Sequence, residues 1–218
     1  MIRLIKAVIF DMDGVLVNSE PINYEINKIT FEKAGIKISK KEFIEEWVVK
    51  GTGSREAIKR HNIRMSYENL QKIKKKIYLD ILKRKVKLKP NAKETIINLH
   101  KKYKLALASH AHKYNVNIIV KKFRLNKFFQ IILGKQDVNK GKPNPEIFLK
   151  AAKKLKVKPE KCLVIEDTEK GILAAKRAGM ICIAIPDSWT KKYNDFSKAD
   201  LVVDNLKELT TDVIENIN

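Results

Sequence analysis

Cysteine is scarce in this 218-residue sequence, which contains only Cys162 and Cys182, each inside a short apolar run. Two cysteines in such positions do not make a framework of disulfide bonds, and we expect both thiols to be reduced and buried in strands. No run of apolar residues approaches the roughly 20 that a helix needs to cross a bilayer. The first apolar segment begins too early for a secretory signal, so we expect a cytoplasmic protein.

Acidic residues are also few: 25 Asp and Glu stand against 46 Lys and Arg, a formal net charge of +21. Such an excess suggests binding to the phosphate backbone of nucleic acids. However, residues 18–88 carry 18 basic and 9 acidic side chains and the remainder carries 28 and 16, so no single arm holds the charge. Recognition motifs and interleaved aromatic residues are missing as well. We expect no nucleic-acid partner, and a basic surface that attracts anionic substrates.

The order of predicted elements divides the chain into a core and an insert. With 44% apolar and 33% charged residues, the composition is that of a folded soluble protein. The apolar run at residues 5–10 predicts a buried strand, and helical spacing then dominates from Glu20 to about Val86. The helices predicted in this block span residues 20–35, 40–49, 54–61 and 67–85.

After Pro90 the pattern changes to alternating helices and strands. Strands are predicted at residues 105–109, 130–133, 162–165, 181–185 and 201–203. Helices are predicted at residues 92–102, 116–123, 145–155 and 169–178, and from residue 206. This alternation predicts an α/β fold, a Rossmann-like parallel sheet with helices on both faces. The first strand must rejoin that sheet, so we expect a core of residues 1–17 and 89–218 with an all-helical cap domain at 18–88.

Two carboxylates, Asp11 and Asp13, follow the first strand at the point where Gly14 begins a turn. Ligands bind at the carboxyl ends of strands in open α/β sheets, and two neighbouring carboxylates need a cation to relieve their repulsion. Taken alone, Asp-x-Asp-Gly more often only ends a strand or caps a turn. A second acidic pair, Glu166 and Asp167, follows the strand at residues 162–165, and capping would explain Asp167 but hardly both acids.

Two further polar residues stand at comparable places. Ser109 follows the apolar run at residues 105–108, where a serine also serves as an ordinary helix cap. Lys142 lies in the segment Gly141-Lys-Pro-Asn-Pro145, whose prolines constrain the backbone ahead of a helix. A solvated loop lysine is the usual alternative.

Taken in sequence order, the segments around these polar residues resemble the four motifs of the haloacid dehalogenase-like hydrolase superfamily. The resemblance is closest to its β-phosphoglucomutase-like branch with a helical cap. The segments that carry the resemblance are residues 11–15 with 19–21, 106–109, 141–148, and 164–167 with 171–179. The resemblance implies that Asp11 is the nucleophile that forms an aspartyl-phosphate and that Asp13 is the general acid and base. It also implies a Mg²⁺ ion held by the Asp11 carboxylate, the Asp13 backbone carbonyl and Asp167, with Glu166 beside them.

The same resemblance implies the residues that bind substrate. Ser109 would bond the transferring phosphoryl oxygens, and Lys142 would neutralise charge on both the phosphate and the nucleophile. The segment at residues 50–56 is similar to the specificity loop of the cap. There Arg55 would hold a second phosphate or a polar sugar group, and Gly51 would allow close approach. We expect His110 at the edge of the pocket rather than on a metal.

Two positions decide between related activities. The acid at Asp13 argues against dehalogenation, because the dehalogenases of the superfamily lack it. Where the mutases of this branch carry a proton-handling histidine, this sequence has Asn23, which cannot exchange a proton near neutral pH. We therefore expect a Mg²⁺-dependent phosphatase of small phosphorylated metabolites, a monomer or weak dimer. The alternatives are a hexose-phosphate mutase and, further off, a non-catalytic nucleic-acid-binding protein.

Overall fold

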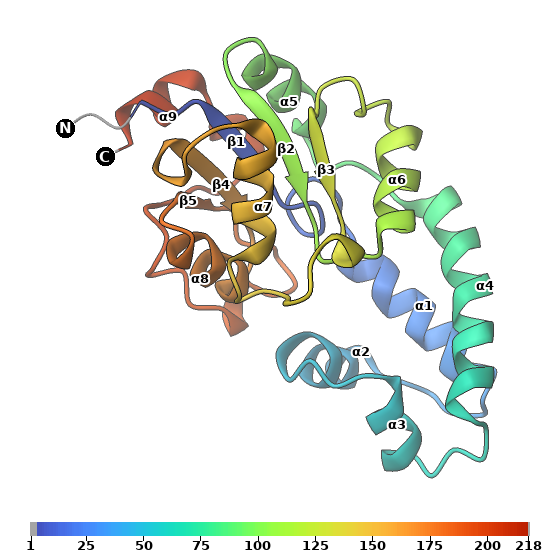
Figure 1. The fold of residues 1–218 in the computed structure, drawn as a ribbon. Coiled ribbons are helices and arrows are strands. Elements are labelled where there is room, and N and C mark those ends of the chain that lie inside the picture. Colours follow the sequence, from blue (N-terminus) through green and yellow to red (C-terminus); the bar gives the residue numbers. More distant parts are fainter. Residues whose placement is uncertain (1–3, 218) are drawn as a thin grey trace. The chain divides into compact units, whose positions relative to one another are not determined.

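The computed structural model describes residues 4–217 and divides the chain into two compact units. The α/β unit consists of the chain up to Asn18 and from Lys87 onward, and the helical unit is Ser19–Val86 (Figure 1). The predicted fold class, an α/β fold with an inserted helical segment, is confirmed. None of the helices described within residues 4–217 is both long and apolar enough to cross a membrane.

A six-stranded parallel sheet forms the centre of the α/β unit, with the order β3-β2-β1-β4-β5-β6. Its strands are β1 (Ala7–Phe10), β2 (Lys104–Ala108), β3 (Ile131–Leu133), β4 (Cys162–Glu166), β5 (Ile181–Ala184) and β6 (Leu201–Val202). Every side chain of β1, β4 and β5 is buried, as expected of strands covered on both faces. Both cysteines are free and buried in these strands, as predicted.

Helices alternate with the strands and supply the crossovers that parallel neighbours require. They are α5 (Ala92–His100), α6 (Lys113–Lys122), α7 (Glu146–Leu155), α8 (Glu169–Arg177) and α9 (Thr211–Asn216), with short 3₁₀ turns η2 (Lys135–Asp137), η3 (Pro159–Lys161), η4 (Lys191–Tyr193) and η5 (Leu206–Glu208). The α7 and α8 helices pack on one face of the sheet, where Phe148 and Ile172 join Ala7 and Ile9 in one apolar cluster. Phe10, the next residue along β1, instead meets Phe129 edge to face.

The helical unit contains α1 (Glu20–Glu32), α2 (Lys40–Phe43), η1 (Ile44–Val49), α3 (Ser54–Arg60) and α4 (Tyr67–Lys85). The long α1 and α4 helices pack against each other, and the Lys74 ammonium donates to the Asn27 side-chain oxygen at 2.8 Å. The segment expected to be one helix at residues 40–49 changes to π-helical geometry at Ile44. The Trp47 ring in that π-helix stacks on Phe43.

The last predicted helix, expected from residue 206, is divided in two. A 3₁₀ turn at Leu206–Glu208 ends before Thr210, whose hydroxyl accepts a hydrogen bond from the Val213 N–H and so starts α9 as a separate helix. Thr210 is therefore an N-cap rather than an interior residue.

The chain leaves and re-enters the α/β unit at one place. Val17 forms an isolated antiparallel bridge with Leu88, and the Lys89 N–H donates to the Leu16 carbonyl at 2.8 Å. These bonds hold the two connecting segments side by side, next to the turn that follows β1.

Candidate active site

The two acidic pairs meet at the carboxyl edge of the sheet because β1 and β4 are neighbours. Phe10 is paired with Ile165, and the Asp11 N–H donates to the Ile165 carbonyl at 2.9 Å. Asp11 is only 5% exposed and Glu166 1% exposed. The parallel pairing thus brings residues more than 150 positions apart in the sequence into one buried cluster.

Lys142 connects these carboxylates. Its ammonium lies 2.5 Å from Asp11 Oδ1 and 2.5 Å from Glu166 Oε1, and it also faces the Ala108 carbonyl at 3.4 Å. The ammonium lies 4.9 Å from the centre of the Phe148 ring, on the helix that follows its loop. Burial opposes the charge on Lys142, but the two carboxylates prevail and raise its pKa above the usual value, so it stays an ammonium.

Negative charge nevertheless exceeds positive charge at this edge. Burial raises the pKa of Asp11 to about 7; Glu166 and Asp13 add to this rise, whereas Lys142 opposes it. Burial likewise raises the pKa of Asp167 well above its usual range, with Glu166 and Asp11 adding to the effect. One lysine therefore does not neutralise the carboxylates, and a further cation would be stabilised here.

Both oxygens of Glu166 are engaged within the protein. Oε1 faces Lys142, and Oε2 accepts from the N–H groups of Asp167 and Thr168 at 2.9 and 3.1 Å and from the Thr168 hydroxyl at 3.0 Å. A Cβ atom at Gly171, in the first turn of α8, would overlap the Glu166 carboxyl group. The first turn of α8 is thus shaped around this carboxylate, which is fixed in position.

Ser109 and Asp13 form the other side of the cluster. The fully buried Ser109 hydroxyl donates to Asp13 Oδ2 at 3.2 Å and accepts from the Ala111 N–H at 3.0 Å. Ser109 follows β2, the other neighbour of β1, so the three central strands each contribute a polar residue to one edge. The hydrogen bond from Ser109 therefore holds the Asp13 carboxyl group in a defined position.

The donor set fits Mg²⁺ through two carboxylates rather than through a closed cage. Within residues 4–217, no three acidic, histidine or cysteine side chains are arranged to hold a metal ion among themselves. Mg²⁺ commonly uses one or two carboxylates and keeps several waters. Asp11 and Asp167 are the acids that would be left for it, because Glu166 is engaged with Lys142 and backbone N–H groups and Asp13 with Ser109. Gly14, at φ +77°, packs so closely on the Asp167 carboxyl that any Cβ atom there would overlap it.

The remaining predicted residues are His110, which lies beside the cluster, and two residues of the helical unit. His110 packs against Gly141, beside the lysine loop, and its pKa is lowered by partial burial and by the ammonium groups of Lys135 and Lys142. Arg55 belongs to the helical unit, where its guanidinium lies 4.1 Å from the centre of the Tyr67 ring. Gly51, at φ +67°, is in the same unit. The structure therefore groups the six core residues, with His110 near them.

One ion pair at this edge was not expected from the sequence. The Lys89 ammonium lies 2.8 Å from Asp187 Oδ2, and these side chains are 18% and 3% exposed. The positive charge of Lys89 also offsets part of the rise in the pKa of Asp167 that burial causes. The position of Asp187 just after a buried apolar strand is the same signal that identified Asp11, and it could have indicated this residue.

Comparison with known proteins agrees with this geometry. The family model of the haloacid dehalogenase-like hydrolases matches residues 8–185. A phosphorylated carbohydrates phosphatase of Thermotoga maritima is 33% identical over 186 residues, 80% of this chain and 82% of that protein. The crystal structure of CbbY from Rhodobacter sphaeroides in complex with phosphate has a TM-score of 0.80 at 26% identity, over 94% and 96% of the two chains. A β-phosphoglucomutase from Clostridium difficile has a TM-score of 0.77 at 28% identity, over 97% and 96%.

Proposed function

This chain belongs to the haloacid dehalogenase-like hydrolase family, and on that premise we propose that it is a Mg²⁺-dependent phosphomonoesterase acting through an aspartyl-phosphate. The observation that carries the proposal is the position of Lys142, which bridges Asp11 and Glu166 while Ser109 holds Asp13 alongside. A buried carboxylate paired with a lysine, and a second carboxyl group next to it, are the groups that a two-step displacement at phosphorus needs.

In the first step, an Asp11 oxygen attacks phosphorus and the bond to the alcohol oxygen breaks, while Asp13 donates a proton to the departing alkoxide. In the second step, Asp13 takes a proton from a water molecule that attacks the aspartyl-phosphate and releases Asp11 and inorganic phosphate. Asp13 thus ends each turnover in its starting state. The Ser109 hydroxyl fixes its carboxyl group between the two steps.

Charge is the main obstacle to this reaction, because an anionic nucleophile must approach an anionic phosphate. Lys142 reduces that repulsion and favours the ionised form of Asp11 against the effect of burial. We assign the remaining positive charge to Mg²⁺, held by Asp11, Asp167 and the Asp13 backbone carbonyl; when bound, it stabilises charge on the phosphate and the nucleophile. Glu166, whose oxygens are both engaged, positions Lys142 and the first turn of α8.

We further propose that the two parts of the chain have different roles. Residues 1–17 and 89–218 would form the catalytic core, and residues 18–88 the cap, with Arg55 and Gly51 contributing to substrate choice. A small phosphorylated sugar or related metabolite is the expected substrate, in line with the carbohydrate-phosphate phosphatase among the relatives. A cytoplasmic location and a monomeric or weakly dimeric state remain predictions.

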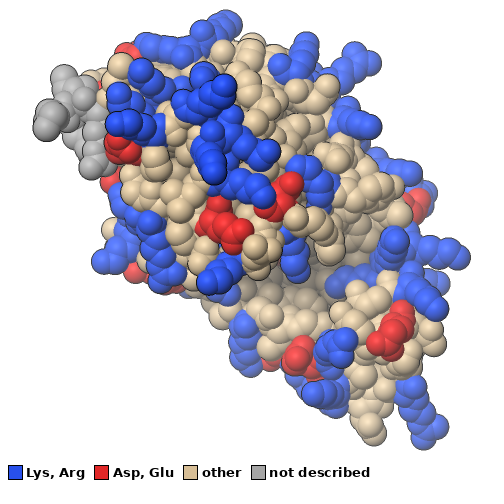
Figure 2. Space-filling view, viewed as in Figure 1, with Lys and Arg blue, Asp and Glu red and all other residues tan. Residues whose placement is uncertain are grey.

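The two alternatives find less support. A hexose-phosphate mutase would need a proton carrier where α1 carries Asn23. Figure 2 shows basic side chains scattered over both units on the face drawn, interrupted by acidic and neutral residues, rather than gathered into one stripe. This distribution suits the attraction of small anions better than the binding of a nucleic-acid backbone along one continuous surface.

A panel of phosphorylated metabolites and an aryl phosphate, assayed with and without Mg²⁺, tests the proposal. We expect phosphate release that depends on Mg²⁺ and falls at least about a thousandfold in Asp11→Asn. Asp204→Asn, which changes an exposed acid of the same unit, is the matched control and should keep full activity. Release that survives Asp11→Asn would contradict the mechanism, and interconversion of hexose phosphates without release would favour the mutase.

A further inference from the structure

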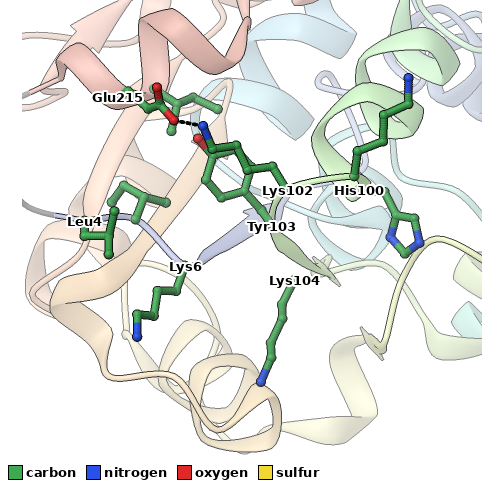
Figure 3. A pocket seen from close by; sticks show the side chains of 10 residues that line it. Leu4, Lys6, His100, Lys102, Tyr103, Lys104 and Glu215 are labelled. Carbon is green, nitrogen blue, oxygen red and sulfur yellow. Dashed lines mark hydrogen bonds and ion pairs between the residues drawn. The ribbon is translucent and has the colours of Figure 1, made fainter.

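A cavity of about 670 Å³ opens at the amino ends of β1 and β2, but its polar groups do not converge. In Figure 3 the Lys102 ammonium meets Glu215 on one side, whereas the Lys6 and Lys104 side chains extend to the other. The helical unit differs in this respect. There one carboxylate gathers several groups around the η1–α3 loop, residues 50–53.

Glu46, in the π-helix η1, contacts this loop and the helix that follows it through both of its carboxylate oxygens. Oε1 accepts a hydrogen bond from the Lys50 ammonium at 2.8 Å. Oε2 accepts one from the Arg60 guanidinium, at the end of α3, at 2.5 Å. The Glu46 side chain is only 13% exposed, and the hydrogen bond from Lys50 lowers its pKa, so it stays ionised. One carboxylate therefore connects η1 with the start of the loop and with the far end of α3.

The π-helical geometry explains why Glu46 holds the loop. The Thr52 N–H and the Thr52 hydroxyl both donate to the Glu46 carbonyl, at 2.8 and 2.6 Å, and Oε2 lies 3.2 Å from the same hydroxyl. In the comparable ending of an α-helix, the acceptor would be the carbonyl five residues before Thr52, that of Trp47, whose side chain carries no carboxylate. The wider turn thus directs both the carbonyl and the carboxylate of Glu46 to one threonine. Turns of this kind are frequent at functional sites.

The same carboxylate determines which cations of this region are paired. Lys50 and Arg60 are both engaged by Glu46. Among the residues that the structure describes, the Arg55 guanidinium has neither a hydrogen-bond acceptor nor an ion-pair partner, and it lies over the Tyr67 ring. A guanidinium stacked on an aromatic ring keeps its N–H groups available at its edge. Of these three cations, Arg55 is the one left to pair with an anion.

From this arrangement we propose that Glu46 is a positioning residue for substrate selection, which fixes the η1–α3 loop so that Arg55 is presented to a second anionic group of the substrate. The inference rests on the proposed phosphatase function, in which Arg55 contributes to substrate choice. A planar guanidinium binds phosphate and carboxylate groups through two parallel hydrogen bonds, and its orientation therefore matters.

Amide hydrogen exchange of the full chain, followed by NMR, tests the fixing of the loop without any ligand. Glu46→Gln loses the charge that holds Lys50 and Arg60, and it should raise the exchange rates of residues 51–53 at least about fivefold. Glu45→Gln changes the exposed neighbouring acid, which lies 3.9 Å from Lys41. This matched control should exchange as the parent does. Equal exchange rates in Glu46→Gln and the parent would overturn the positioning role.

Binding of two probes that cannot be hydrolysed tests the effect on selection. Propane-1,3-diylbisphosphonate carries a second anionic group that propylphosphonate lacks, and calorimetry with saturating Mg²⁺ gives the ratio of their dissociation constants. We expect the parent to favour the bisphosphonate, and this preference to fall about tenfold in Glu46→Gln but not in Glu45→Gln. Absence of the preference in the parent, or an unchanged preference in Glu46→Gln, would overturn the proposal.

Thr52→Val separates positioning from charge, because it removes the hydroxyl and leaves the ion pairs of Glu46 in place. It should reduce the preference as Glu46→Gln does, and a loss confined to Glu46→Gln would overturn the positioning role. A preference that depends on Glu46 would support the inference even if no ester released phosphate, and that failure would fall on the proposed phosphatase alone. Phosphate release without any preference would overturn this inference alone.

Discussion

Replacing Lys142 by methionine tests how the buried carboxylates are held. Methionine keeps an unbranched chain that can still lie against Phe148, but it removes the ammonium that lies 2.5 Å from both Asp11 and Glu166. Breaking a buried ion pair by removing one partner costs about 3–5 kcal/mol, because it leaves an uncompensated charge. For a chain of this length, that loss corresponds to a melting temperature about 6–20 °C lower.

The penalty should depend on pH, because the stranded Asp11 carboxylate can take up a proton instead. In the metal-free protein, burial already raises the pKa of Asp11 to about 7. Lys142→Met should therefore be strongly destabilised at pH 8 and much less at pH 5, where Asp11 is protonated and less charge is left unpaired. Loss of packing alone would give the same penalty at both pH values.

Thermal unfolding followed by circular dichroism, in the presence of a chelator at pH 5 and pH 8, measures this difference. The exposed Lys121→Met serves as the control, with a shift expected near zero. With Mg²⁺ present, aryl phosphate hydrolysis by Lys142→Met should fall about 100- to 1000-fold. A melting temperature at pH 8 within about 2 °C of the parent would refute the role given to this lysine.

Two more outcomes follow from charges in the structure. Lys89→Met leaves the buried Asp187 unpaired and should cost about 3–5 kcal/mol in urea unfolding. Lys85→Met, which breaks the exposed pair with Glu25, should cost under about 1 kcal/mol; equal costs would contradict this. In the folded state, burial raises the pKa of Asp11 to about 7. Between pH 4 and 7 the folded chain therefore keeps a proton on Asp11 that the unfolded chain has lost. The metal-free protein should therefore lose stability as pH rises through that range, and Asp11→Asn should lose less stability. Urea midpoints that change equally with pH in the two proteins would disprove this.

Much of the fold could be predicted because its signals are local. The apolar runs at residues 7–10 and 162–165 form strands whose side chains are buried on both faces of the sheet, and the alternation with helices fixes their parallel direction. Polar residues that directly follow such runs gather at one edge of the sheet. This rule accounts for Asp11, Glu166 and Ser109 without knowledge of the strand order.

Other features depend on distances that the sequence does not encode locally. The pairing of Phe10 with Ile165 places β1 between β2 and β4, and continuous apolar runs carry no mark of register or neighbour. The engagement of both Glu166 oxygens depends on where the N–H groups after β4 point. The π-helix at Ile44–Val49 is likewise a matter of packing, since its residues have ordinary helical spacing.

The carboxylate cluster carries its own argument for a divalent cation. Asp11, Asp13, Glu166 and Asp167 stand against one ammonium in contact with two of them, and burial together with the neighbouring carboxylates raises the pKa values of Asp11 and Asp167. A protonated Asp11 is a poor nucleophile, so this rise in its pKa would impair catalysis near neutral pH without a further cation. A divalent cation would stabilise the ionised carboxylates and attract the phosphate that Asp11 is proposed to attack. The buried, incompletely neutralised edge is therefore suited to binding a metal ion and a phosphate together rather than either one alone.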